Sequence, residues 1–416
     1  MRILHTSDWH LGRTLHGRQR HDEFAAFLDW LAATLDDERI DVLIVAGDIF
    51  DTSTPGTRAQ NLYYRFLWKA AQSHCRHVVV VAGNHDSPSL LDAPAALLRA
   101  LDVHVIGAPP ADLRDEVLVL RDADDAPALI VCAVPYLRDR DLRTVEAGES
   151  TDDKDHKLLE GLRAHYAAVL DAAREVRIGC GMPLPIVVTG HLFTAGGRTV
   201  EGDGVRDLSI GSLSHAPSDV FGSEAAYVAL GHLHVPQDVS GATTIRYSGS
   251  PIAMGFGEVG QEKSVCIVEL GGEGVAEMQH ACSVRRLGVP CFRRMARVRG
   301  SWQEIVEQLD ALAASDEPVM LEVVHEGAEA LGDLQDRVLE RVSETKLEVL
   351  RAQDVPAMRA LQLRGSDGET LDALDELTVF ARLLAARNVD EAQRAELTAT
   401  YCEALTALHE MDEGEE

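Results

Sequence analysis

The sequence lacks the features of membrane, secreted and disulfide-rich proteins. No apolar run approaches the roughly 20 residues that a membrane span needs, and residues 1–8 lack the long apolar segment of a signal peptide. None of the 7 cysteines belongs to a CxxC pair, so we expect buried, reduced thiols and no thiolate metal site. We therefore expect a soluble protein of the cytoplasm with no membrane partner.

Basic residues are also scarce. The chain has 39 lysines and arginines against 68 aspartates and glutamates, which gives a formal charge of −29. This excess argues against a protein that coats nucleic acid by bulk electrostatic attraction, although net charge says little about a local groove. A P-loop of the form GxxxxGK[ST] is absent as well, so any ATP-driven step must come from a partner.

What the sequence does have is a series of short apolar, β-branched runs, each of which leads into a polar motif. These runs predict buried strands, and helical stretches at 21–35, 57–72 and 155–174 separate several of them. The alternation predicts an α/β layered domain, in which functional groups collect beyond the carboxyl ends of the strands. Because 416 residues exceed the usual size of one hydrophobic core, we expect two or three structural units.

The later part of the chain follows a different pattern. The alternation of strand-like runs and polar motifs stops near residues 273–279. Two helix candidates lie at 371–387 and 390–410. An apolar stripe on the first of them indicates either packing on the preceding domain or docking to helices of another protein. Between these regions, we predict a βαβαβ unit with a strand at 293–298, a helix at 302–314, a strand at 319–324, a helix at 334–342 and a strand at 347–352. The predicted domains are thus 1–272, 273–366 and 367–416.

Five polar motifs occupy the predicted strand ends. Each is weak alone, but DxH, GD, GNHD, GH and GHxH occur in this order, and the last four directly follow strand-like runs. Asp, Asn and His offer the oxygen and nitrogen donors that suit manganese, iron or zinc at a site that also binds phosphate. Two such ions about 3.5–4 Å apart can bind a phosphate and activate water for in-line attack. The motifs are Asp8-Trp9-His10, Gly47-Asp48, Gly83-Asn84-His85-Asp86, Gly190-His191 and Gly231-His232-Leu233-His234.

The order of these motifs resembles that of the calcineurin-like metallophosphoesterases. The flanking segments are similar to those of the SbcD family, the nuclease subunits of bacterial complexes with a coiled-coil ATPase; these segments are residues 3–12, 46–52 and 247–251. The similarity runs through the phosphoesterase domain to about residue 270, and beyond it only the layout matches. It implies a layered β-sandwich flanked by helices, with a small βαβαβ capping domain and C-terminal helices.

The resemblance also implies a role for each ligand. One metal ion would be bound by Asp8, His10 and His234, and the other by Asn84, His191 and His232, with Asp48 bridging both; we expect Mn²⁺ at both positions. The family gives His85 a catalytic role without metal, in which it donates a proton to the leaving oxygen or stabilises charge on the phosphate. Asp51 would orient His85, although a loop cap is the alternative for this residue.

Contacts to the substrate are predicted with less support from the motifs. Three arginines, Arg13, Arg18 and Arg20, follow the first motif within one loop, where cations can contact the phosphates of a strand without reading its sequence. A solvated basic loop is an equally good interpretation. The hydroxyls of Ser248 and Ser250 lie beside the last ligands in the sequence and suit a phosphate contact, whereas a plain turn is the alternative.

The resemblance further implies partners. The family is homodimeric through helices that follow the second and third motifs, and apolar segments at 62–68 and 90–98 are available here, although such stripes are more often core. The terminal helices would bind an SbcC-like ATPase, giving a heterotetramer that cuts DNA in repair and recombination. We expect an exonuclease on double-stranded ends and an endonuclease on single strands or hairpins.

Two other functions compete with this interpretation. A nucleotide phosphodiesterase or a protein phosphatase could use the same centre, but the phosphatases have Asp-Arg-Gly after the second motif and GNHE at the third, whereas this chain has Asp51-Thr52-Ser53 and GNHD. A scaffold without activity, which serves only as a platform for the ATPase, is the second rival. The presence of all seven ligands and His85 argues against it.

Overall fold

The computed structural model divides the chain into two compact units, Met1–Ala296 and Arg297–Glu416, and each is described by itself. The structure describes residues 1–144, 150–194, 197, 216–239, 244–271 and 282–358, together with eight separate residues between 377 and 401. Within these residues, no helix has both the length and the apolar character needed to cross a membrane.

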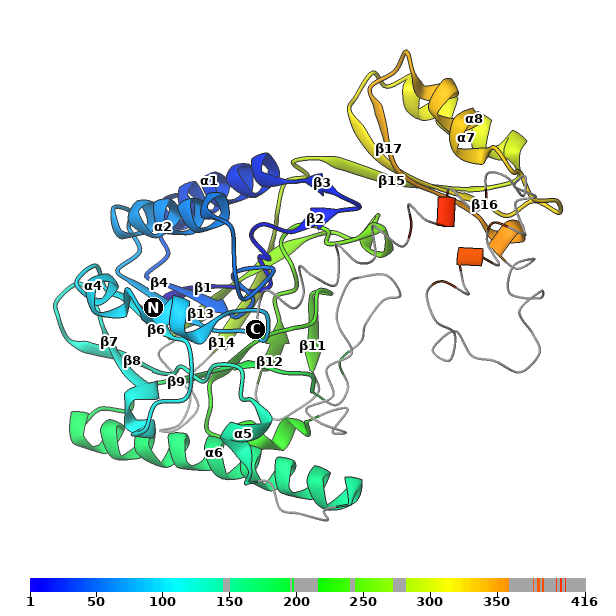
Figure 1. Cartoon of the computed structure of the whole chain (residues 1–416). Coiled ribbons are helices and arrows are strands. Elements are labelled where there is room, and N and C mark those ends of the chain that lie inside the picture. The colour runs from blue at the N-terminus through cyan, green and yellow to red at the C-terminus, as the bar shows by residue number, and fades with distance from the viewer. Residues whose placement is uncertain are drawn as a thin grey trace. The chain divides into compact units, whose positions relative to one another are not determined.

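The first unit is built on two six-stranded β-sheets that pack face to face (Figure 1). In each sheet, four neighbouring strands run parallel. In the first sheet, β13 and β14 continue beyond these strands on one side as antiparallel pairs, and in the second sheet β7 and β11 pair antiparallel at the two edges. The first sheet has the order β14 (Cys282–Gly288), β13 (Ser264–Leu270), β1 (Arg2–Thr6), β4 (Val42–Ala46), β5 (His77–Val81), β6 (Val103–Ile106). The second has the order β11 (Gln237–Val239), β12 (Thr244–Tyr247), β10 (Tyr227–Gly231), β9 (Ile186–His191), β8 (Pro127–Cys132), β7 (Val117–Arg121).

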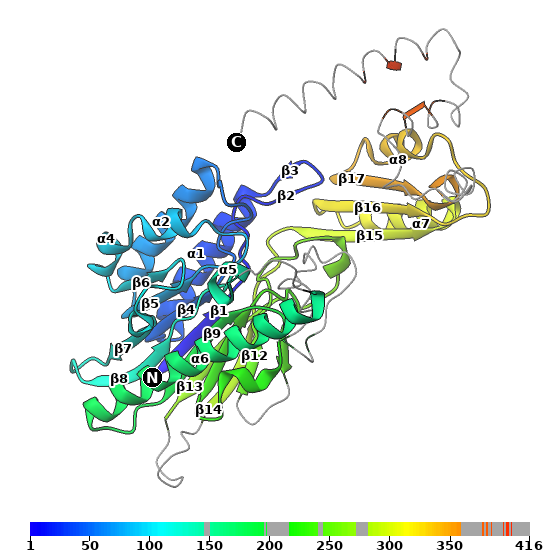
Figure 2. The same ribbon diagram turned by 60° about the horizontal axis from the view of Figure 1, so that its bottom comes forward.

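Helices cover the outer face of each sheet, so the unit has four layers (Figures 1 and 2). The long helices α1 (His21–Asp37) and α2 (Thr57–Ala71) lie over the first sheet, and α6 (Thr151–Cys180) lies over the second. The shorter elements are α3 (Pro88–Asp92), α4 (Ala95–Arg99), α5 (Asp139–Leu142), the hairpin β2 (Thr14–Leu15) and β3 (Arg18–Gln19), and the 3₁₀ turns η1 (Leu113–Glu116), η2 (Ser218–Phe221) and η3 (Phe256–Glu258).

The apolar strands are buried on both faces. In β4, Leu43 and Val45 pack in the core beneath the helices, while Val42 and Ile44 pack between the two sheets. Successive side chains of a strand point to opposite faces, so a strand between two apolar layers reads as one continuous apolar run. The predicted layered β-sandwich flanked by helices is confirmed, and the predicted helices correspond to α1, α2 and α6.

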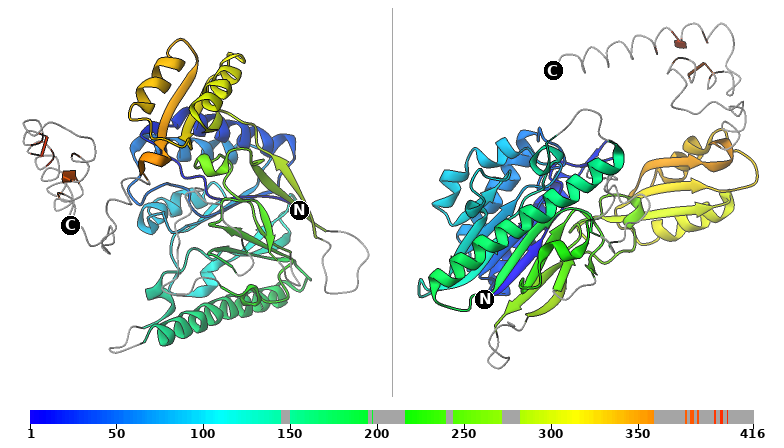
Figure 3. Two further views of the ribbon diagram at one scale, coloured as in Figure 1. Left: turned by 90° about the vertical axis from the view of Figure 1, so that its right-hand side faces the viewer. Right: turned by 90° about the horizontal axis from the view of Figure 1, so that it is seen from below.

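The second unit has the predicted βαβαβ order (Figure 3). Its helix α7 begins at a capping box, in which the Ser301 amide donates to a Glu304 carboxylate oxygen at 2.8 Å and the Ser301 hydroxyl faces the Glu304 amide at 3.5 Å. The elements are β15 (Arg294–Gly300), α7 (Trp302–Ala313), β16 (Val319–His325), α8 (Leu334–Val342) and β17 (Leu347–Asp354), and the three strands form one sheet.

The division between the units falls after residue 296, whereas the sequence placed a boundary after residue 272. The difference arises because β14 pairs with β13 along its whole length and so completes the first sheet. The predicted helices at 371–387 and 390–410 lie largely outside the described residues. Their described side chains include Phe380 and Tyr401, whose rings stack at 4.0 Å between centroids.

Candidate metal centre

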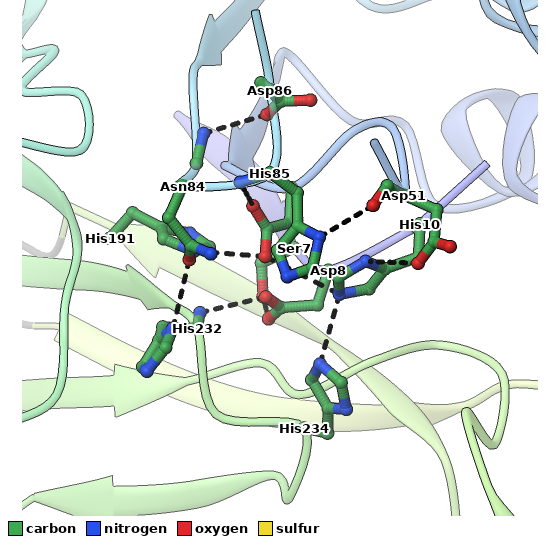
Figure 4. A network of polar contacts seen from close by, with 12 residues as sticks. Ser7, Asp8, His10, Asp51, Asn84, His85, Asp86, His191, His232 and His234 are labelled. Atoms are coloured by element: carbon green, nitrogen blue, oxygen red, sulfur yellow. Dashed lines mark hydrogen bonds and ion pairs between the residues drawn. The ribbon is translucent and has the colours of Figure 1, made fainter. Parts of the chain in front are cut away.

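Five strand ends bring the polar motifs together at one edge of the sandwich. The motifs follow β1, β4 and β5 of the first sheet and lie at the ends of β9 and β10 of the second, all of them parallel strands within their sheets. Figure 4 shows that the side chains of the labelled residues point toward one another from both sheets. The carboxyl ends of these strands therefore form one polar centre, as expected for an α/β sheet.

The first group of donors consists of Asp8, His10 and His234. One ligand atom from each lies within 4.8 Å of the others, and all three residues are buried. The Nε2 atoms of the two histidines are 3.1 Å apart. Two nitrogens bound at right angles to one ion, with bonds of roughly 2.1 Å, would be about 3 Å apart. The spacing therefore fits one metal ion between them.

The second group joins Asp48 to His191, Asn84 and His232. Nε2 of His191 lies 3.1 Å from Oδ1 of Asn84, and Nδ1 of His232 lies 3.3 Å from the same oxygen. The nitrogen of His232 that faces the other two donors is therefore Nδ1, so one ion could bind Oδ1 of Asn84, Nε2 of His191 and Nδ1 of His232 together. These donors fit a second divalent ion.

Asp48 lies between the two groups. Its Oδ2 is 3.3 Å from Nε2 of His191 and 3.6 Å from Nε2 of His10, so one carboxylate oxygen faces ligands of both ions. Burial would raise the pKa of Asp48, but the neighbouring charges of His191 and His10 lower it far below the usual range. A carboxylate that stays ionised in this position suits a bridging ligand.

The backbone around these ligands is strained. Asp8, His10 and Asp48 have φ angles of 53°, 47° and 52°, in the left-handed region that such residues seldom adopt. Each such residue costs on the order of 1–3 kcal/mol, and positions of this kind cluster at functional sites. A side chain at the glycine before Asn84 would place its Cβ only 2.1 Å from Oδ1 of Asp48, so Gly83 permits the close approach of the two loops.

Metal binding should release a proton from His191. Burial lowers the pKa of this imidazole, but the Asp48 carboxylate more than compensates and raises it to about 9, so without metal the ring is protonated at neutral pH. A metal ion binds only the neutral ring, so its affinity should weaken as the pH falls below about 9. Titration calorimetry with Mn²⁺ at pH 7.5, in buffers of different ionisation enthalpy, should show about one proton released per chain. Binding without proton release would contradict this assignment.

A buried cluster of polar side chains supports His234 from behind, and sequence reasoning did not identify it. Nδ1 of His234 faces a Glu258 carboxylate oxygen at 3.3 Å, and Glu258 also forms an ion pair with Lys263. The Lys263 ammonium donates to the carbonyl of His234 at 3.2 Å and to the Ser250 hydroxyl at 3.0 Å. A carboxylate behind a ligand histidine fixes the tautomer and orientation of its ring.

Replacing Glu258 by glutamine should therefore weaken one metal site. Loss of such a carboxylate typically lowers metal affinity by about 10–100-fold, and here only the ion bound by His234 should be affected. The measurement is the Mn²⁺ concentration that gives half of the maximal activity, with Glu262→Gln, an exposed glutamate of the same segment, as the matched control. Equal Mn²⁺ requirements in the two variants would show that Glu258 does not support the metal.

His85 stands apart from the seven donors. Its backbone amide donates to Oδ1 of Asp48 at 2.9 Å, and its Nδ1 lies 2.7 Å from the backbone carbonyl oxygen of Asp51. A carbonyl oxygen accepts only, so Nδ1 carries a hydrogen and Nε2 remains available for the reaction. The ring packs edge to face on His10 at 4.9 Å between centroids, beside the metal ligands.

Asp51 lies beside His85, as predicted, but its carboxylate does not orient that histidine. The carboxylate faces Nη1 of Arg13 at 3.1 Å and Nδ1 of His10 at 3.3 Å, while only the backbone carbonyl contacts His85. The predicted orienting role of Asp51 would therefore belong to its main-chain carbonyl, while its side chain supports the ligand His10.

Asp86, the last residue of the GNHD motif, joins the loop after β5 to the loop after β4 by hydrogen bonds. Its two carboxylate oxygens accept hydrogen bonds from the amides of Gly83 at 2.8 Å, Phe50 at 2.9 Å and Ile49 at 3.1 Å. Burial and the nearby Asp48 raise the pKa of Asp86 to about 6. This residue holds the Asp48 loop against the Asn84 loop, a role that the sequence motif alone did not reveal.

The residues predicted to contact substrate lie in different environments. Arg13 is at the centre beside Asp51, and Arg18 lies exposed on the β2–β3 hairpin. Arg20 is buried; its guanidinium holds Glu23 with a closest distance of 2.6 Å and donates to the carbonyl of Ala253 at 2.6 Å. Its predicted phosphate contact is corrected, because these contacts keep it inside the fold.

The two predicted serine contacts are also not supported. Ser248 and Ser250 are fully buried. The hydroxyl of Ser248 lies 2.8 Å from the hydroxyl of Ser7, which in turn donates to Asp8 at 2.5 Å, and the hydroxyl of Ser250 donates to Glu258 at 3.2 Å. These hydroxyls therefore support the ligands Asp8 and His234 and do not face a bound phosphate.

A cation near the centre was not identified from the sequence. Arg138 follows the carboxyl end of β8; its Nη2 donates to the carbonyl of Asp86 at 3.4 Å and its guanidinium lies over the ring of Tyr136. The ring of Tyr136 in turn approaches that of His191, at 6.3 Å between centroids. The rule that functional groups collect at strand ends could have found both residues.

Comparison with known proteins places these features in a family. The family described as calcineurin-like phosphoesterase matches residues 1–236, and the family described as type 5 capsule protein repressor C-terminal domain matches residues 291–388. The SbcD component of the SbcCD nuclease of Escherichia coli K12 is 37% identical over 410 residues, which cover 98% of each chain. The corresponding components from Rhodobacter capsulatus (37% identical, 76% of this chain and 77% of the relative) and Bacillus subtilis (39% identical, 65% and 66%) are also similar.

Proposed function

Because the chain belongs to the calcineurin-like phosphoesterases and to the SbcD family of SbcCD nuclease components, we propose that it cuts DNA within a complex with a coiled-coil ATPase. It is a nuclease, a phosphodiester hydrolase that uses divalent metal ions. The observation that carries the proposal is the convergence on one centre of His85 and of seven side chains that could bind metal: Asp8, His10, Asp48, Asn84, His191, His232 and His234. We propose exonuclease action on double-stranded ends and endonuclease action on single strands or hairpins, in DNA repair and recombination.

The side chains divide into binding and catalytic roles in this proposal. Asp8, His10 and His234 would bind one ion, Asn84, His191 and His232 the other, and Asp48 both. Two divalent ions held there would supply Lewis-acid activation of the phosphodiester and of the attacking water. Mn²⁺ is the proposed metal, and the mixture of carboxylate, amide and imidazole donors suits it, as it also suits iron or zinc.

His85 completes the centre as the proposed general acid. With Nδ1–H held by the Asp51 carbonyl at 2.7 Å, the ring is fixed in one orientation and Nε2 can carry the proton. That proton would pass to the oxygen that leaves when the P–O bond breaks, so the fragment that carries this oxygen departs with a neutral hydroxyl group instead of an alkoxide. A protonated His85 would also stabilise negative charge on the phosphate.

Two arginines remain as proposed contacts to the DNA backbone. Arg13 lies beside the centre through Asp51, and Arg18 lies on the exposed hairpin that follows the first motif. Cations placed in this way contact phosphates without reading sequence. They would also add local positive charge to a strongly acidic chain.

The proposed assembly is a homodimer that joins two ATPase subunits in a heterotetramer. Exposed apolar side chains on the helices after the second and third motifs support the dimer: Trp68 on α2 is 59% exposed and Leu97 on α4 is 72% exposed. Tyr63 and Phe66 of the same region are buried core residues instead. The names of the relatives as parts of SbcCD support the ATPase partner, and we propose that the C-terminal helices bind it.

The rival functions predict different products. The purified chain with Mn²⁺ should degrade linear duplex DNA and cut single-stranded DNA, and EDTA should abolish both activities because the ions are removed. Gel analysis of end-labelled DNA, with a chromogenic nucleotide diester and a phosphopeptide in parallel, separates the candidates. Activity confined to the small esters would indicate a phosphodiesterase or phosphatase, and no hydrolysis of any substrate would indicate a scaffold.

A further inference from the structure

A second cluster of metal-binding side chains lies at the opposite end of the first sheet. His77 begins β5, Asp102 lies just before the neighbouring strand β6, and His104 lies on that strand. One ligand atom from each of the three residues lies within 4.8 Å of the others. Because β5 spans 5 residues, at about 3.3 Å each, this cluster is roughly 17 Å along the strand from the motif that follows β5. It is separate from the phosphoesterase centre.

The strand pairing explains why the two histidines meet. Val79 of β5 pairs with His104 of β6, and paired residues point to the same face of the sheet. His77 lies two residues before Val79, so its side chain points to that face as well and lies diagonally opposite His104. The two rings have their centroids 6.2 Å apart. Asp102 is held in the turn before β6 with a φ of 56°, and its carbonyl accepts from the amide of Val78. The backbone therefore fixes all three residues.

The hydrogen bonding of His77 leaves one nitrogen for a ligand. Its Nε2 lies 2.9 Å from the carbonyl oxygen of Arg121, on the facing sheet, and the amide of the same residue donates to it at 3.2 Å. Both contacts of the ring are thus made by Nε2, whereas Nδ1 is buried without a hydrogen-bond partner. In the tautomer that donates from Nε2 to the carbonyl, Nδ1 is a lone pair that can bind a metal ion. A histidine that donates one ring N–H to a backbone carbonyl and offers its other nitrogen is the usual arrangement of a metal ligand.

The second histidine of the cluster, His104, lies on β6 beside an opening at the surface. The side chain of His104 borders a surface hollow of about 600 Å³, which gives an ion a path to the cluster.

We propose that His77, Asp102 and His104 form a third metal site, for a divalent ion of the zinc class. Two imidazoles and one carboxylate are a common ligand set for Zn²⁺, with a water in the remaining position. The ion would tie β5 to β6 at the edge of the first sheet, and through His77 to Arg121 of the second sheet. Its role would be structural, since the ion would join residues of two neighbouring strands at the end of the sheet away from the phosphoesterase centre.

The test counts Zn²⁺ ions in the full-length protein. Equilibrium dialysis at micromolar Zn²⁺, followed by atomic absorption, should give one more ion per chain in the wild type than in His104→Gln or Asp102→Asn. The second variant guards against misfolding, because Asp102 is exposed and asparagine tolerates its left-handed backbone. His74→Gln, which removes a histidine of the same segment outside the cluster, should retain the wild-type count.

Two further measurements make the result decisive. Zn²⁺ should raise the melting temperature of the wild type and of His74→Gln by several degrees more than that of His104→Gln, because an ion bound only to the folded state stabilises it. Cleavage of DNA should be unchanged in His104→Gln, which separates this site from the phosphoesterase centre. Equal Zn²⁺ content in the wild type, His104→Gln and Asp102→Asn would overturn the proposal.

Discussion

Replacing His85 by alanine should lower the rate of DNA cleavage by about 10²–10⁴-fold while both metal ions remain bound. The magnitude is that of a lost general acid. The metals should remain because the imidazole is held by the Asp51 carbonyl, and because its contact with Asp48 is made by the backbone amide, which alanine keeps. The measurements are single-turnover cleavage of end-labelled duplex DNA and the Mn²⁺ content of the same preparation.

A matched control and an opposite outcome can be stated for this variant. His156→Ala removes an exposed histidine, 72% accessible on α6, and should cleave at the wild-type rate. If His85→Ala lost one of its ions, His85 would be a ligand rather than an acid. A full cleavage rate with both ions bound would show that the leaving oxygen takes its proton from another source.

Replacing Asp48 by asparagine should abolish activity and metal binding together. The carboxylate faces His191 at 3.3 Å and His10 at 3.6 Å, so it touches ligands of both proposed ions, and a neutral amide cannot supply the charge that holds two dications close together. We expect the Mn²⁺ content to fall below one ion per chain. We also expect a loss of cleavage at least as large as that of His85→Ala, about 10⁴-fold or more, because the ions supply both activation and positioning.

Asp51→Asn is the matched control for that variant. It removes a nearby carboxylate whose ion pairs at the centre are with Arg13 and His10. It keeps the backbone carbonyl that contacts His85. At saturating Mn²⁺ we expect both ions to remain bound and the rate to fall by less than about tenfold, although the ion bound by His10 should bind more weakly because that histidine loses its carboxylate support. Retention of two ions in Asp48→Asn would contradict the bridging role.

The parts of this centre that the sequence predicted are those that local structure determines. Each ligand motif directly follows a strand of a parallel sheet, and parallel strands bring their carboxyl ends to one edge. A run such as Val78–Val81 therefore places Asn84 and His85 without any knowledge of distant contacts. The helices predicted at 21–35, 57–72 and 155–174 and the βαβαβ order of the second unit also agree with the structure, because they too follow from local sequence patterns.

The parts that the sequence did not predict depend on contacts between distant residues. Glu258 meets His234 across 24 positions, and no local periodicity marks it as a support for a ligand. Arg18 and Arg20 are two residues apart in one basic loop, yet one is exposed and the other is buried against Ala253, 233 positions away. Composition cannot separate such neighbours, because packing decides which of them reaches solvent.

Crystals of the chain grown with Mn²⁺ would test the central assignment most directly, through anomalous scattering at the manganese edge. Two peaks about 3.5–4 Å apart are expected. One should lie among Asp8, His10 and His234, the other among Asn84, His191 and His232, with Asp48 between them and His85 bound to neither. A single peak, or a peak bonded to the His85 ring, would contradict this account of the centre.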